Sequence, residues 1–269
     1  MNKWTKKLTG LVCALALMAL CLATAVAENI SFAGGSGTKE DPYQIETLEQ
    51  LQAMANDMAA SYVLTADIDA GNLEAWTPIG TLVAIDEAGE TPDPAYAFTG
   101  AFDGNGHTIS NLNVVGTQML SGLFGVTANA TISNVTFKNL TVEGSVMVGA
   151  IGYTYCSTVE NVAVDGATVH GVDAFAEVGY PAQMIGALTG ASMDSVYSGC
   201  AVSNVTMTVD SNPEAQDLFS GAQNCGILGG GFEGSSLSDC TVSDSTLTVS
   251  GDYCYGIGGM NGCVMNGEY

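Results

Sequence analysis

The chain has 269 residues, and its 28 acidic residues outnumber five lysines with no arginine, so the formal net charge is −23. A nucleic-acid partner is excluded, and anionic membranes and polyanionic glycans are disfavoured, because few cationic side chains are present to neutralise them. Hydrophobic residues make up 47% of the chain, which is enough for a packed core and argues against a disordered acidic chain.

Residues 1–27 have the layout of a secretory signal peptide. A basic start, MNKWTKK, precedes the apolar stretch LTGLVCALALMALCLATA, and small residues occupy positions 25–27. We expect cleavage before Glu28, giving a secreted or cell-surface chain with no membrane insertion. An uncleaved anchor is the alternative, because about 18–20 apolar residues can span a bilayer. Cleavage leaves Lys39 and Lys138 against 28 carboxylates, a formal charge of −26.

Residues 28–97 are expected to form an N-terminal cap with one short helix and several strands. Thr47 precedes an amphipathic stretch and Gln50 follows three residues later, which is a capping-box arrangement. Such a helix covers the open end of a stack of strands, which otherwise exposes an unpaired edge. Asp67 and Asp69 alternate on one strand face and are candidate calcium ligands. The alternative, which we favour, is that both carboxylates cap turns.

Residues 98–269 contain five aligned stretches, which begin at Ile109, Ile132, Val159, Tyr197 and Leu237. Two columns, separated by five residues in each copy, contain only Asn, Asp or Gly. These types adopt left-handed backbone angles most readily, so each column is predicted to be a structural bend. The first column is Asn111, Asn134, Asn161, Gly199 and Asp239. The second column is Gly116, Asn139, Gly166, Asn204 and Asp244.

Apolar positions alternate with small or polar ones around these bends, and a glycine-bounded apolar pair precedes each copy. This pattern predicts an all-β fold, a right-handed parallel β-helix with three short strands per coil and a pectate-lyase-like architecture. A β-sandwich of hairpins is the rival, but it does not require equivalent columns in every repeat. Insertions at 172–184 and 210–224 are predicted to be loops at one corner. We expect the coils to continue beyond Tyr269.

Six cysteines follow the signal segment, without a C-x-x-C motif, so a zinc site is poorly supported. Cys200 and Cys240 fall in the same inward column of adjacent coils. They are candidates for a disulfide or, as we favour, for stacked small apolar residues. A ladder of outward threonines is a candidate ice-binding or sugar-stacking face, although threonine is also a common exposed strand residue. Its members are Thr141, Thr168, Thr206, Thr246, Thr208 and Thr248.

The motifs GSGTKEDPYQI, YVLTADIDA, WTPIG and FTGAFDGNGHTISNL, followed by G-apolar-apolar-G repeats, cover nearly all of residues 34–260. In this order they resemble the GLUG-motif proteins, which are large bacterial surface or secreted proteins. The module also occurs in the noncatalytic part of some IgA-cleaving zinc endopeptidases. The resemblance implies no catalytic residue and no cofactor, and the chain lacks the His-Glu-x-x-His motif of those peptidases.

We therefore expect a noncatalytic, adhesin-like module that presents loops and a polar wall to an extracellular protein or glycan, either alone or joined to further domains. A polysaccharide lyase or glycoside hydrolase is the alternative, because such enzymes share the β-helix. A lyase for acidic sugars needs cationic residues that this chain lacks, and a hydrolase needs two carboxylates. Candidate carboxylate and acid–base pairs are Asp165 with Glu160, Asp239 with Asp244, and Asp103 with His107, for each of which a structural role is the favoured alternative.

Overall fold

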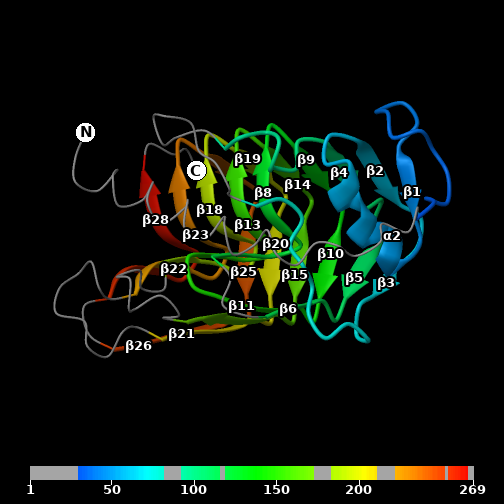
Figure 1. The fold of residues 1–269 in the computed structure, drawn as a ribbon. Coiled ribbons are helices and arrows are strands. Elements are labelled where there is room, and N and C mark those ends of the chain that lie inside the picture. Colours follow the sequence, from blue (N-terminus) through cyan, green and yellow to red (C-terminus); the bar gives the residue numbers. More distant parts are fainter. Residues whose placement is uncertain are drawn as a thin grey trace, which may run out of the picture.

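The computed structural model describes residues 30–81, 92–115, 119–172, 183–210, 222–251 and 254–265. The signal-like segment 1–27 and Gly116 lie outside these ranges. Within them the chain forms almost entirely short strands, which align in five parallel sheets (Figure 1).

The sheets are numbered I to V in the order in which the chain visits them. Sheet I contains β1 (Tyr43–Ile45), β2 (Ser61–Leu64), β4 (Ala101–Asp103), β9 (Thr131–Ser133), β14 (Thr158–Glu160), β19 (Val196–Ser198) and β24 (Ser236–Ser238). Sheet II contains β3 (Ile68–Asp69), β5 (Thr108–Ser110), β10 (Thr136–Lys138), β15 (Ala163–Asp165), β20 (Ala201–Ser203) and β25 (Thr241–Ser243). Sheet III contains β6 (Asn113–Val114), β11 (Thr141–Gly144), β16 (Thr168–Gly171), β21 (Thr206–Asp210) and β26 (Thr246–Ser250).

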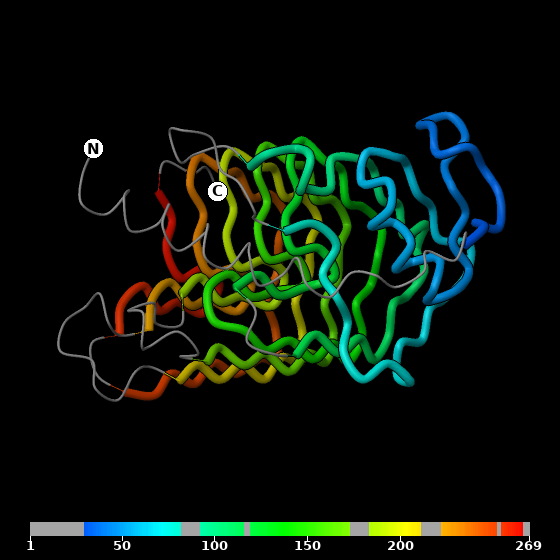
Figure 2. The backbone as a smooth tube through the Cα atoms, viewed as in Figure 1, coloured from blue at the N-terminus to red at the C-terminus, as the bar shows by residue number. Residues whose placement is uncertain are grey.

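The remaining two sheets complete each turn of the chain. Sheet IV contains β7 (Leu120–Ser121), β12 (Met147–Val148), β17 (Gln183–Ile185), β22 (Gln223–Gly226) and β27 (Tyr255–Gly258). Sheet V contains β8 (Phe124–Ala128), β13 (Ile151–Tyr155), β18 (Thr189–Met193), β23 (Gly229–Glu233) and β28 (Asn261–Met265). Each strand pairs in parallel with its counterparts one turn before and after, and the tube in Figure 2 shows these turns stacked along one axis. The chain is therefore a parallel β-helix.

From β4 to β28, each coil contains five short strands where three were predicted. The bends divide one side of the coil into the strands of sheets I, II and III, as expected. The glycine-bounded segment then forms two strands, in sheets IV and V, because its glycines pack against neighbouring backbone. A Cβ at Gly122 would lie 2.5 Å from the carbonyl oxygen of Gly149, and one at Gly149 would lie 2.9 Å from Thr189. The tight corner between these strands therefore depends on glycine.

The N-terminal segment contains the helix that the capping box predicts. Helix α2 (Leu48–Ala53) continues into the 3₁₀ turn η1 (Met54–Asn56), and Thr47 Oγ1 accepts a hydrogen bond from the Gln50 amide at 3.3 Å. Leu51 is buried in the core, and α2 lies at the blue end of the stack (Figure 1). The strands β1, β2 and β3 are hydrogen-bonded into sheets I and II. These three strands thus extend sheets I and II toward the N-terminal end of the stack.

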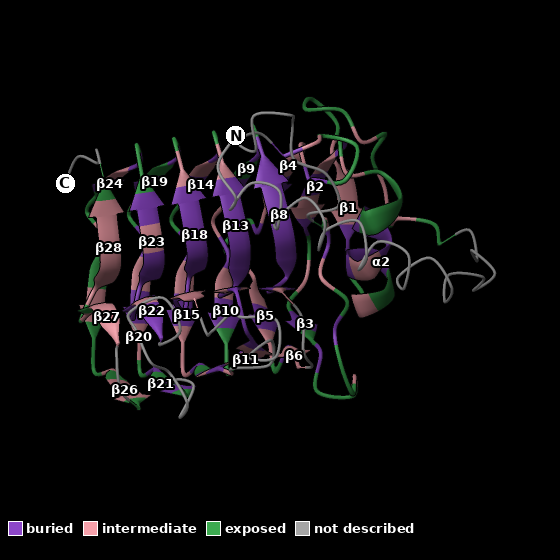
Figure 3. Ribbon diagram, turned by 60° about the vertical axis from the view of Figure 1, so that its left-hand side comes forward, coloured by how far each residue is buried: buried purple, intermediate pink, exposed green. Residues whose placement is uncertain are grey.

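Inward side chains stack in columns because the strands pair in register. In sheet II, Phe137 lies between Ile109 and Val164, and all three are buried. Figure 3 shows this burial as a purple interior that runs through the central coils, while the last coil is more exposed. Burying each such side chain contributes about 1.5–3 kcal/mol, and stacking makes the core continuous from coil to coil.

Positive φ angles occur at the nine predicted bend residues that lie in the described ranges, from 46° at Asp244 to 75° at Gly166. Each of these residues lies between two strands of a coil. The asparagines also hydrogen-bond to one another, since Asn161 Nδ2 donates to Asn134 Oδ1 at 3.1 Å. The bends therefore combine a left-handed backbone with a ladder of side-chain amides.

The structure shifts the first sequence copy by one bend relative to the predicted alignment, because Phe102 rather than Ile109 pairs with Ile132. Asn111 stacks on Asn139, whose Nδ2 donates to Asn111 Oδ1 at 3.2 Å, and Ile109 pairs with Phe137. Asn111 therefore belongs to the second bend column, although we placed it in the first column with Asn134. The tripeptide Ile-Ser-Asn occurs at both corners, and local sequence does not distinguish a corner that precedes sheet II from one that follows it.

A third column of bends, between sheets V and I, was not predicted. Its members with positive φ are Asn129, Cys156, Asp194 and Gly234. Buried serines follow three of them and satisfy backbone groups across coils: the Ser157 amide donates to Ser195 Oγ at 3.0 Å, and the Ser195 amide to Ser235 Oγ at 3.1 Å. The signal was present in the sequence as a small polar residue after a bend-forming residue, but Cys156 concealed it.

Candidate functional site

A flat polar surface, here called the polar face, is formed by the outward side chains of β11, β16, β21 and β26 in sheet III. Along each strand, inward residues such as Val142 and Val169 are buried, and the alternate residues point outward. Parallel in-register pairing then aligns the outward residues in rows across the coils. The polar face consists of Thr141, Glu143, Thr168, His170, Thr206, Thr208, Asp210, Thr246, Thr248 and Ser250.

The first row consists only of threonines, which follow one another from Thr141 through Thr168 and Thr206 to Thr246. The last three are exposed. Successive rungs of a parallel sheet lie about 4.8 Å apart, so the row presents regularly spaced hydroxyl groups. Each hydroxyl can donate and accept a hydrogen bond, and this makes the row suited to ligands rich in hydroxyl or amide groups.

The second row begins with Glu143 and His170, and Asp210 of the third row also contacts His170, which therefore lies between two carboxylates. Nδ1 of His170 lies 3.2 Å from Glu143 Oε2, and its Nε2 lies 2.8 Å from Asp210 Oδ2. The three residues come from β11, β16 and β21, and the contacts therefore join three consecutive coils. Partial burial lowers the pKa of His170, but the hydrogen bonds to Asp210 and Glu143 outweigh this effect, so its pKa is raised overall.

These three residues, Glu143, His170 and Asp210, are here called the triad. The triad limits the functions that the polar face can perform. A Thr-x-Thr pattern occurs on β21 and β26 only, because Glu143 and His170 occupy the second row on β11 and β16. An extended ice-binding lattice is therefore not formed. Both ring nitrogens of His170 face carboxylates, so this imidazole is poorly placed to act as a free general base.

Both long insertions leave the β-helix at the edge of the polar face. β16 ends at Gly171 and β17 begins at Gln183, while β21 ends at Asp210 and β22 begins at Gln223. Residues 173–182 and 211–221 lie outside the described residues. In the preceding coil the same connection between β11 and β12 consists of Ser145 and Val146 alone. The common corner predicted for the insertions 172–184 and 210–224 is thus the boundary between sheets III and IV.

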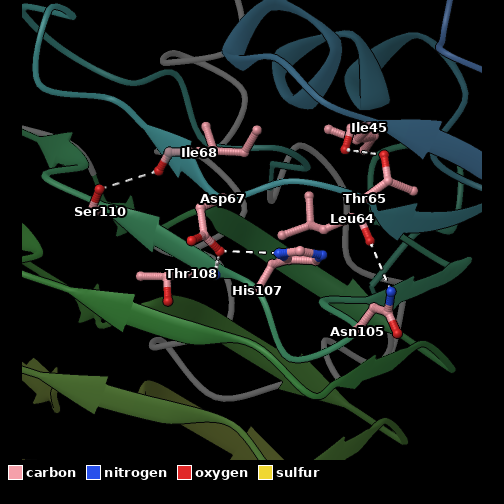
Figure 4. Close-up of polar contacts among 9 residues, drawn as sticks. All are labelled: Ile45, Leu64, Thr65, Asp67, Ile68, Asn105, His107, Thr108 and Ser110. Carbon is pink, nitrogen blue, oxygen red and sulfur yellow. Dashed lines mark hydrogen bonds and ion pairs between the residues drawn. The ribbon is translucent and has the colours of Figure 1, made fainter.

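The candidate calcium ligands lie elsewhere and accept hydrogen bonds from nearby N–H groups. Asp67 Oδ1 lies 2.9 Å from the Thr108 amide and 3.1 Å from His107 Nδ1 (Figure 4). These contacts, led by the Thr108 amide, lower the pKa of Asp67. Asp69 Oδ1 accepts from Asn111 Nδ2 at 2.8 Å and from the Gly71 amide at 3.0 Å, and these bonds lower the pKa of Asp69. The geometry favours turn capping for both carboxylates.

The carboxylates considered for catalysis also have structural partners. Asp103 Oδ1 accepts from the Asn105 amide at 2.8 Å and from Asn134 Nδ2 at 3.0 Å, whereas His107 pairs with Asp67. Asp103 and His107 are therefore not brought together as an acid–base pair.

Asp165 likewise belongs to a bend rather than to a paired-carboxylate site. Its Oδ1 accepts from Asn204 Nδ2 at 2.7 Å and from Ser203 Oγ at 3.1 Å, and these bonds lower the pKa of Asp165. Glu160 lies in sheet I, where its Oε1 accepts from Ser198 Oγ at 3.4 Å. In the described ranges, no cluster of three or more His, Cys, Asp or Glu side chains is arranged to hold a metal ion.

Two known proteins are similar in sequence to part of the chain. No protein-family model matches. Halomucin of Haloquadratum walsbyi is 39% identical over 122 residues, which is 43% of this chain and 1% of halomucin. A candidate Gly-rich membrane protein of Evansella cellulosilytica is 36% identical over 138 residues, 46% of this chain and 14% of that protein. The chain thus matches only a small part of either relative.

A solved structure shares the fold. A candidate immunoglobulin A1 protease from Bacteroides ovatus superimposes with a TM-score of 0.62 and 21% sequence identity, over 87% of this chain and 65% of that one. At this identity the similarity concerns the β-helix itself. Among the described residues, no helix is long and apolar enough to cross a membrane. The chain is similar to surface-type proteins in part of its sequence and to a protease-associated structure in its fold.

Proposed function

We propose that the chain is a noncatalytic, extracellular or surface-displayed β-helix module that binds a glycan or protein ligand in the manner of an adhesin. The observation that carries this proposal is the position of the polar face, whose rows of threonines end where both long insertions leave the coils. Loops mounted on a rigid repeat scaffold are common sites of recognition. The polar face would supply the flat part of the binding surface, and the insertions its rim.

The side chains of the threonine row are available for a ligand. Thr168, Thr206 and Thr246 are exposed, and their hydroxyls make no side-chain hydrogen bond within the described part of the chain. The net charge of −23 disfavours polyanionic ligands. A neutral glycan or a basic protein surface is therefore the favoured ligand. One relative is named as a mucin and another as a membrane protein, which supports a location at the cell surface.

Binding of the purified chain to an array of neutral and acidic glycans and extracellular-matrix proteins tests the proposal. We expect the triple variant T168V/T206V/T246V to weaken binding at least about tenfold, since each lost hydroxyl removes a hydrogen bond of about 0.5–1.5 kcal/mol. Valine keeps the shape and strand preference of threonine. The matched control is T241V, an exposed threonine on sheet II in the same coil as Thr246, which should leave affinity unchanged.

Deleting residues 211–221, which ends before the buried Ala222 and strand β22, tests the rim of the surface separately. Weaker binding at an unchanged melting temperature supports a role for this insertion. Equal binding by the deletion, the triple variant and the parent chain would refute the proposed surface, and the absence of any ligand would refute the binding role. Release of reducing ends or unsaturated sugars from a polysaccharide would instead support a hydrolase or lyase.

A further inference from the structure

Two cysteines occupy equivalent positions on neighbouring coils. Cys200 follows the bend at Gly199, and Cys240 follows the bend at Asp239. The next residues, Ala201 and Thr241, are paired in register, and the Thr241 amide donates to the Cys200 carbonyl oxygen at 2.9 Å. The coils are thus hydrogen-bonded to each other at the cysteines themselves.

This geometry matches what a disulfide requires. Parallel neighbours in a sheet lie about 4.8 Å apart, and disulfide-bonded cysteines have Cα atoms about 4.4–6.8 Å apart with side chains that point the same way. Cys200 and Cys240 each directly precede an in-register pair, Ala201 with Thr241, so their side chains occupy neighbouring positions in one column. In the paired strands, Cys225 lies in register with Ile257 and Cys263 with Gly231.

The two thiols also differ in environment, and this difference orders their reactions. Cys200 is fully buried, whereas Cys240 is partly exposed. Proximity to the Cys200 thiol lowers the pKa of Cys240, against the opposing effect of burial. The same proximity, together with burial, raises the pKa of Cys200. Because the thiolate is the attacking species, Cys240 is the reactive member of the pair.

We propose that Cys200 and Cys240 form a reversible disulfide that ties the last two coils together at the corner between sheets I and II. The oxidant is a low-molecular-weight disulfide. The Cys240 thiolate attacks one of its sulfurs and releases one small thiol. Cys200 then loses its proton and attacks the Cys240 sulfur, which releases the second small thiol. Two protein thiols are oxidised to one disulfide, and one small disulfide is reduced to two thiols.

The bond would close a loop that contains β20 to β24 and the insertion 210–224. Cross-linking a loop of this length restricts the unfolded chain, so oxidation should raise the melting temperature by on the order of 5–10 °C. This disulfide does not depend on the ligand-binding role proposed above, because it rests on strand register and on the equivalent positions of the two cysteines.

Peptide mapping of the oxidised chain tests the proposal. The purified protein is equilibrated with oxidised glutathione, denatured without reductant, alkylated with N-ethylmaleimide and digested with an Asp-specific protease, which cuts between the two cysteines at Asp210. We expect one cross-linked peptide pair joining Cys200 to Cys240, which dithiothreitol removes. Alkylation of both residues in the unreduced protein would overturn the proposal, as would a cross-link from either one to another cysteine.

Serine variants test the order of attack. C200S should accumulate a glutathione adduct at Cys240, because no second thiol is present to release it, whereas C240S should leave Cys200 unmodified. Both variants should lose the rise in melting temperature on oxidation. C156S, which removes an exposed cysteine at another corner, is the matched control and should retain both the cross-link and the rise. An adduct at Cys200 but not at Cys240 would contradict the assigned roles.

Discussion

At the bends, a single asparagine provides both a backbone conformation and a link between coils. Asn134 has a φ of 52°, and its side chain donates to Asp103 Oδ1 at 3.0 Å and accepts from Asn161 Nδ2 at 3.1 Å. Its Asn-Val-Thr sequence also matches a glycosylation acceptor. A bend asparagine, an inward apolar residue and an outward threonine produce this pattern without any glycan, and the amide that would carry one is already hydrogen-bonded.

Replacing Asn134 by valine should destabilise the chain by about 2–4 kcal/mol, because a β-branched residue is strained at positive φ and the amide ladder is lost. Glycine accepts the backbone angle and loses only the ladder, so N134G should cost about 1–2 kcal/mol. The matched control T136V, at an outward position two residues later, should change stability by less than about 0.5 kcal/mol. Urea denaturation measures the free energy of unfolding of all three variants. If N134V is no less stable than N134G, backbone strain at the bend is contradicted.

At the scale of the elements, the triad of Glu143, His170 and Asp210 couples three strands of sheet III. Its effect depends on protonation, since protonated His170 donates to a carboxylate on each side and the neutral ring donates to only one. The raised pKa of His170 means that the folded state holds this proton more tightly than the unfolded chain. Its contribution to stability is fully present below the unfolded pKa of about 6.5 and is lost as pH rises through the folded pKa.

The variant H170Q should therefore be less stable than the parent chain at pH 6, and the difference should shrink by pH 9. The side chains of His170, Glu143 and Asp210 are 35%, 36% and 59% exposed, so solvent screening limits the difference to about 0.5–1 kcal/mol. Urea denaturation of both proteins at each pH measures it. The variant E143Q/D210N should remove most of the pH dependence of stability, whereas the control T248V on the same face should preserve it. If H170Q lowers stability equally at both pH values, the coupling of His170 to the two carboxylates is contradicted.

For the whole molecule, the charge is unbalanced and only weakly compensated. The net charge is −23, and every ion pair in the described ranges involves His107 or His170 rather than a lysine. Repulsion among carboxylates spread over an elongated stack therefore opposes folding, while the stacked apolar core supports it. The same charge keeps a long, partly open β structure soluble.

Raising NaCl from about 10 mM to about 500 mM should raise the melting temperature by a few degrees, because salt screens this repulsion. CaCl₂ at equal ionic strength should give a rise no larger than NaCl does, since Asp67 and Asp69 already accept hydrogen bonds from N–H groups. Differential scanning calorimetry of the parent chain and of D67N/D69N measures both responses. A calcium-specific rise that D67N/D69N abolishes would instead reveal a calcium site.

Prediction from sequence succeeded where a constraint on the local backbone conformation selects a particular residue type. Bends need left-handed angles, so Asn139 and Asn204 were recognisable from their type and spacing alone. It failed where a constraint arises between coils. The Ile-Ser-Asn motif at residues 109–111 fits either corner, and only its pairing with Phe137 and Asn139 decides which one it forms.

The polar face illustrates the same division. The threonine row was visible from the repeat because its members recur at one position, whereas the contacts of His170 were not. Glu143 and Asp210 lie 27 residues before and 40 residues after it in the chain, and only the stacking of β11, β16 and β21 brings their side chains together. The sequence also did not predict five strands per coil. Short segments separated by glycine contain too few residues to show the alternation of apolar and polar side chains that indicates a strand.

By itself, the sequence determined the class of architecture and the inward columns of this protein, because both follow from residue type and period within one coil. The tertiary structure decided the register between coils, and with it cross-coil contacts such as the amide ladder and the contacts of His170 with Glu143 and Asp210. The physical reason is that neighbouring coils are joined by backbone hydrogen bonds that are nearly the same in any register. Register is set by the packing of the whole core, and no local segment contains that information.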